Sequence, residues 1–65
     1  MSVRAELRRE LSRAETAIDK VNAHLQKAGA YAVEGKRPEL DDALFAMANL
    51  LTASKETLAS LRESM

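Results

Sequence analysis

His24 is the residue best suited to acid–base chemistry in this sequence, because imidazole titrates near neutral pH. A catalytic histidine needs a nucleophile or an orienting carboxylate beside it. On a helix, its neighbours three and four residues away are Lys20, Val21, Lys27 and Ala28. None of these side chains fits either role. His24 is therefore predicted to lie at the flank of a helical bundle, and we expect no catalytic residue, no enzymatic activity and no small-molecule substrate.

Three carboxylates close together, Glu39, Asp41 and Asp42, raise the question of a metal site. They lack the glycine-containing ligand loop of calcium sites. The chain has no cysteine and one histidine, which excludes thiolate and multi-histidine metal sites. Their place just after Pro38 fits the first turn of a helix, where the helix dipole favours negative charge. We therefore expect no metal and no cofactor.

Binding of a polyanion such as nucleic acid is the remaining role that the charged residues could have. Four arginines gather near the N-terminus: Arg4, Arg8, Arg9 and Arg13. However, the ten basic and ten acidic side chains of the whole chain cancel, whereas nucleic-acid binders usually carry a basic excess. Glu6 and Glu10 are interleaved and can pair with arginines three residues away. The cluster is therefore predicted to be a solvated surface, and nucleic acid is not the expected partner.

Apolar spacing predicts the elements that carry these residues. Apolar residues recur at alternating intervals of four and three, from Leu7 to Ala32 and, interrupted at Ser54, from Leu40 to Met65. This 3.5-residue period indicates two amphipathic helices, at about 3–33 and 38–64, the first capped by Ser2. The predicted seam, where helices pack together, consists of Leu7, Leu11, Ile18, Val21, Leu25, Leu40, Leu44, Met47, Leu50, Leu51, Leu58 and Leu61.

Residues 34–37 separate the two stripes and predict a turn. Gly35 is expected to close the first helix in a left-handed conformation, and Pro38 is suited to start the second. The alternative is one long helix kinked at Pro38, although the glycine and the proline are two independent breaks. So short a connection joins antiparallel neighbours. The fold is therefore predicted to be all-α, a single helical-hairpin domain over residues 1–65.

A hairpin of two helices is expected to leave part of its apolar surface exposed to water. Chains of 65 residues fold marginally alone, and this one has no disulfide to support it. Ala17, Tyr31, Ala43 and Leu50 widen the stripes to about three positions in seven, a pattern typical of bundles. We therefore expect two hairpins to form a homodimeric four-helix bundle.

The stretch ALFAMANLL, residues 43–51, is apolar around the whole helix, which indicates burial on more than one side. Phe45, Ala48 and Thr52 share one side of it and are a candidate face for an amphipathic helix of another protein. The alternative is that Phe45 is an isolated exposed apolar residue, which is ordinary on protein surfaces.

These features predict a non-enzymatic protein–protein interaction module of the adaptor, chaperone or regulator type, whose partner is itself, another helical protein, or both. An RNA- or DNA-binding helical dimer and a structural oligomerisation piece of a larger assembly are the alternatives. At the level of fold alone, the architecture resembles plasmid copy-control RNA-binding dimers and small chaperones of bacterial secretion systems. The N-terminus lacks the apolar core of a signal peptide and no apolar run approaches 18 residues, so a cytoplasmic protein without a membrane segment is expected.

Overall fold

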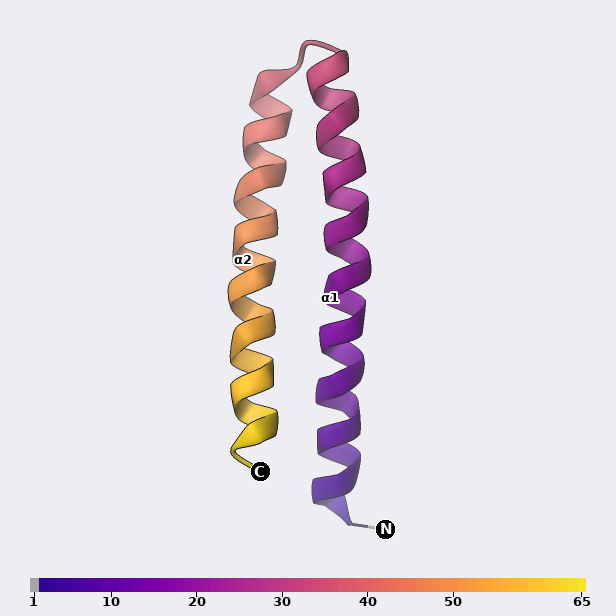
Figure 1. Ribbon diagram of the computed structural model, residues 1–65, viewed down its shortest axis with the longest axis vertical. Helices are drawn as coiled ribbons and strands as arrows, with labels where there is room; N and C mark the ends of the chain where they lie inside the picture. The colour runs from indigo at the N-terminus through magenta and orange to yellow at the C-terminus, as the bar shows by residue number, and fades with distance from the viewer. Residues whose placement is uncertain (1) are drawn as a thin grey trace.

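The computed structural model describes residues 2–65, which form two helices joined by a short turn (Figure 1). α1 spans Val3–Glu34 and α2 spans Pro38–Glu63. The helices run antiparallel and side by side, so the start of α1 and the end of α2 lie at the end of the rod away from the turn (Figure 1). The all-α hairpin is confirmed with bounds within one residue of those expected, and the single kinked helix is wrong.

Local sequence explains where each helix begins. The Ser2 hydroxyl accepts a hydrogen bond from the backbone N–H of Ala5 at 3.1 Å, which caps α1. Pro38 lies in the first turn of α2, where its missing N–H leaves no hydrogen bond unmade. The Arg37 side chain pairs with Glu39 at 2.9 Å and, with a backbone hydrogen bond, holds the pKa of that carboxyl below its usual value.

The turn corrects the expectation for Gly35. Gly35 has φ −80°, and the left-handed residue is Lys36, with φ 58°. The backbone N–H groups of Gly35 and Arg37 donate to the carbonyls of Tyr31 and Ala32, each at 2.8 Å. The last carbonyls of α1 are thus satisfied with the left-handed residue one position later than expected, at a cost of roughly 1–2 kcal/mol for a residue with a Cβ.

The line of contact between the helices is rotated relative to the predicted seam. Its apolar centre consists of six residues of the predicted seam that are all partly buried: Leu11, Ile18, Leu25, Leu44, Leu51 and Leu58. On one side of this centre the partly or fully buried row contains Glu15, Asn22, Gly29, Asp41, Ala48, Lys55 and Arg62. On the other side, six residues of the predicted seam remain exposed: Leu7, Val21, Leu40, Met47, Leu50 and Leu61.

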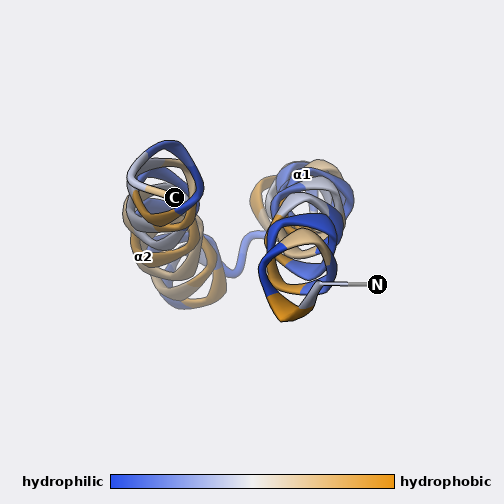
Figure 2. Cartoon of the chain, turned by 90° about the horizontal axis from the view of Figure 1, so that it is seen from below, coloured by the Kyte–Doolittle hydropathy of each residue, from blue (hydrophilic) through white to orange (hydrophobic). Residues whose placement is uncertain are grey.

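The hairpin has almost no enclosed core. Of residues 2–65, only Gly29 and Ala32 are buried, and no large side chain there is fully buried. The rod measures 51 × 16 × 11 Å, and a view along the helices shows their outward sides uncovered (Figure 2). Two helices cannot enclose a core between them. Much of the apolar surface therefore remains in contact with water. Neither described helix combines the length and apolar character needed to cross a lipid bilayer.

Candidate interaction surfaces

One side of the hairpin carries most of its exposed large apolar side chains. Ala28 and Tyr31 of α1 line one hollow together with Leu40 and Ala43 of α2, so these four residues lie on the same side of the rod. Residues seven apart repeat on the same side of each helix, which extends the surface toward the chain ends. The broad apolar face consists of Leu7, Val21, Ala28, Tyr31, Leu40, Ala43, Met47, Leu50 and Leu61.

The composition of the broad apolar face matches the centre of a protein interface. It holds seven of the ten large apolar side chains that the described structure leaves exposed. Charged side chains of α1, such as Arg13, Lys20 and Lys27, recur at intervals of seven on a row beyond its edge. Depletion of charge from an apolar centre distinguishes interface cores from ordinary surface.

The opposite face is closed by ion pairs along the half nearer the chain ends. Arg62 of α2 donates two hydrogen bonds to the Glu15 carboxylate of α1, at 2.8 and 3.2 Å. Lys55 of α2 donates to Asp19 of α1 at 2.5 Å. The Glu15 side chain is only 12% exposed, so this pair is partly withdrawn from water. These contacts also set the register of the two helices, because each charged group has one partner across the seam.

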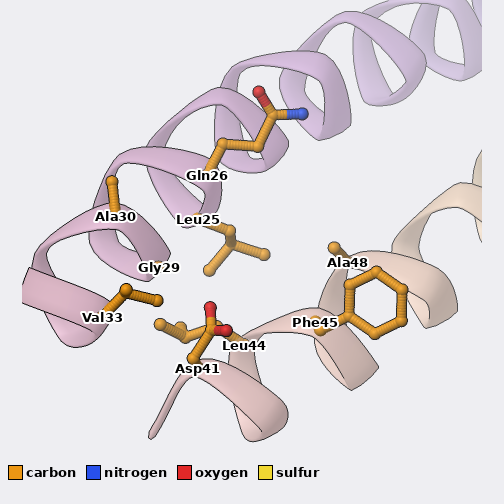
Figure 3. Close-up of a pocket in the computed structure, with 9 residues that line it drawn as sticks. All are labelled: Leu25, Gln26, Gly29, Ala30, Val33, Asp41, Leu44, Phe45 and Ala48. Carbon is orange, nitrogen blue, oxygen red and sulfur yellow. The ribbon is translucent and has the colours of Figure 1, made fainter. Parts of the chain in front are cut away.

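The half of that face nearer the turn is hollow instead. A pocket of about 270 Å³ opens between the helices (Figure 3). We call it the Phe45 pocket; it is lined by Leu25, Gln26, Gly29, Ala30, Val33, Asp41, Leu44, Phe45 and Ala48. The Phe45 ring lies beside Ala48 on α2, and the Asp41 carboxylate points from α2 toward α1.

Gly29 makes room for the Asp41 carboxylate. A Cβ at position 29 would lie 2.9 Å from Asp41 Oδ1, closer than real Cβ atoms approach an oxygen. Sequence reasoning interpreted Asp41 only as a helix-start charge and did not single out Gly29. The available signal was a glycine inside a regular helix, where it costs about 1 kcal/mol relative to alanine and therefore often has a packing reason.

The candidate partner face lies on the Phe45 side of α2. Phe45 and Ala48 line the pocket, and Thr52 follows four residues after Ala48 on the same side of the helix. The Thr52 hydroxyl donates to the Ala48 carbonyl at 3.0 Å, which occupies its proton within the helix. Phe45 is 68% exposed and Leu50 is 70% exposed, yet they lie on opposite faces of the hairpin.

The four arginines do not converge on one surface. Arg9 pairs with Glu6 at 3.2 Å, and Arg13 pairs with Glu10 at 2.6 Å, as the spacing predicts. At about 100° per residue, the series from Arg4 to Arg13 spreads over roughly half the circumference of α1. Within residues 2–65, no three His, Asp or Glu side chains come close enough together to hold a metal ion.

Comparison with known protein families, with characterised proteins and with solved structures gives no significant match to this chain. The functional interpretation therefore rests on the surfaces that its own residues form.

Proposed function

We propose that this protein is a non-enzymatic helical interaction module that self-associates through its broad apolar face. In this arrangement the face of one hairpin packs against the same face of a second copy, giving a four-helix bundle. The observation that carries the proposal is the concentration of seven exposed large apolar side chains on one side of the rod, whereas ion pairs cover half of the other side.

The size of the face suits such a dimer. The rod is 51 Å long and 16 Å wide, so covering one side hides on the order of 800 Å² per chain, which is the share of one partner in a standard interface. The chain has no net charge, so two copies do not repel one another at long range. Burial of this surface supports the fold as well, which makes apparent stability depend on protein concentration.

A dimer of this kind leaves the Phe45 pocket open, because the pocket lies on the side away from the broad apolar face. Each hairpin would therefore keep a second surface for an element of another protein. This observation favours an adaptor, chaperone or regulator over a purely structural oligomerisation piece.

Sedimentation equilibrium over a wide range of concentration tests the proposal. We expect a dimer at twice the 7.1 kDa chain mass. Leu50→Glu should weaken dimerisation by about 100-fold, because it places a carboxylate in the buried centre of the interface. Phe45→Glu is the matched control, since Phe45 is equally exposed on the other face, and it should leave the dimer intact. A monomeric wild-type chain, or a Leu50→Glu variant that dimerises as well as wild type, would refute self-association through this face.

A further inference from the structure

The acidic residues along the opposite face of the hairpin differ in whether a basic side chain of the chain pairs with them. Asp41, Ala48, Lys55 and Arg62 form one row of α2 at intervals of seven, beside the line of contact with α1. Near the chain ends, the two basic side chains of this row, Lys55 and Arg62, each form an ion pair with an acidic side chain of α1. Asp41 has no such complement: within residues 2–65, no basic side chain forms an ion pair with its carboxylate and no side chain donates a hydrogen bond to it.

The carboxylate lies in surroundings that favour a partner of opposite charge. Asp41 is partly buried, its oxygen approaches buried Gly29, and the pocket walls around it are mostly apolar. Within residues 2–65 the buried side-chain oxygen without a partner is Asn22 Oδ1, so the Asp41 carboxylate keeps contact with water at the mouth of the pocket. A cation that enters the pocket would meet this unpaired charge beside apolar walls.

We propose that the Phe45 pocket binds one cationic side chain of a partner protein, an arginine or lysine carried on a helix. Its apolar walls would cover the methylene stem, as long basic side chains commonly arrange themselves. The exposed Phe45 ring would offer its face to the charged head group, and Asp41 would receive its N–H donors. Arginine suits the pocket better than lysine, because guanidinium is less strongly hydrated and can donate two parallel hydrogen bonds to a carboxylate.

This site is independent of self-association, because it lies on the other face of the hairpin. A monomeric result in sedimentation would therefore leave it unaffected, and a negative result here would leave the dimer unaffected. The group that the pocket accepts is cationic. A preference for a neutral apolar group would contradict the proposal.

A small probe tests the site in the intact chain by NMR titration of backbone amides. The probe is n-butylguanidinium, and the neutral control is n-butylurea, which has nearly the same shape. We expect saturable shifts at Gly29, Asp41 and Phe45 with a Kd on the order of 10 mM, as for a ligand of about eight heavy atoms. Binding of n-butylurea should be at least about fivefold weaker, because it lacks the charge that Asp41 recognises.

Two neighbouring carboxylates provide a matched pair of variants. Asp41→Asn should remove the preference for the cation, whereas Asp42→Asn makes the same change of charge on an exposed residue outside the pocket and should leave binding unchanged. Gly29→Ala should weaken binding too, because its Cβ would displace Asp41 Oδ1 while alanine preserves the helix. Equal losses in Asp41→Asn and Asp42→Asn, or equal binding of the charged and neutral probes, would overturn the proposal.

Discussion

The two faces of the hairpin differ in the side chains that border the contact between the helices: one face has ion pairs, and the other has exposed apolar side chains. Along the opposite face, Glu15 and Asp19 of α1 find their partners Arg62 and Lys55 within the chain. Along the broad apolar face, side chains such as Leu40, Met47 and Leu61 reach past the seam and stay about half exposed. A polar edge can be completed by two helices, because ion pairs tolerate contact with water. An apolar edge needs further helices to cover it, because its stabilisation comes from removing surface from water.

Leu50 and Leu51 show how closely the two environments adjoin. Leu51 is partly buried against α1, whereas Leu50, one residue earlier, points away from α1 and is largely exposed. Adjacent residues on a helix differ by about 100° in direction. Leu51 therefore packs within the hairpin, whereas Leu50 is available for contact with another chain.

Leu51→Glu should have the largest effect, because it breaks the seam that both faces share. A carboxylate between the helices should cost about 3 kcal/mol or more at every protein concentration. The Leu50→Glu variant should lose stability mainly at high concentration, where the proposed self-association would make the wild-type chain dimeric. Urea unfolding followed by circular dichroism at two concentrations measures both effects. If the two variants behaved alike at each concentration, the distinction between seam and outer face would be wrong.

Arg62→Ala should have an intermediate effect that is confined to the opposite face. Loss of Arg62 leaves the Glu15 carboxylate, only 12% exposed, without its two donors. We expect a loss of about 1–2 kcal/mol in the free energy of unfolding and no change in dimer mass.

The matched control for Arg62→Ala is Arg13→Ala, which removes an exposed pair with Glu10 on a single helix. It should change stability by less than about 0.5 kcal/mol. Urea midpoints compare the two variants. Equal midpoints would mean that the ion pair between the helices contributes no more than an ordinary surface pair.

Glu39 at the turn should give the smallest effect. Its pKa is lowered in the folded chain, chiefly by the Arg37 side chain. A lowered folded-state pKa contributes stability above the unfolded-state value, and that contribution is lost as pH falls through the folded-state value. Wild type should therefore lose slightly more stability than Glu39→Gln as the pH drops below about 4.5, and salt should reduce the difference. Parallel pH profiles of the urea midpoint for the two chains would contradict this expectation.

Local features of the structure were predictable because they depend on residues close in the chain. The Ser2 cap, the start of α2 at Pro38 and the Glu10–Arg13 pair all involve neighbours within four residues. The left-handed residue was placed wrongly at Gly35, because the hydrogen bonds closing α1 decide which turn residue takes the positive φ. The Asp41 contact with Gly29 was missed because it joins residues on different helices, and its presence depends on how far each helix is rotated.

The sequence by itself determined that there are two amphipathic helices and where each begins and ends, because a 3.5-residue apolar period and its Gly and Pro breaks are local properties. Only the tertiary structure decided which edge of each stripe turned inward. The stripes are wider than one helix contact, so the period permits several rotations. The structure selects the one that brings Arg62 to Glu15 and Asp41 over Gly29. The same rotation leaves Leu40, Met47 and Leu61 exposed, because a single neighbouring helix can cover only one side of α2.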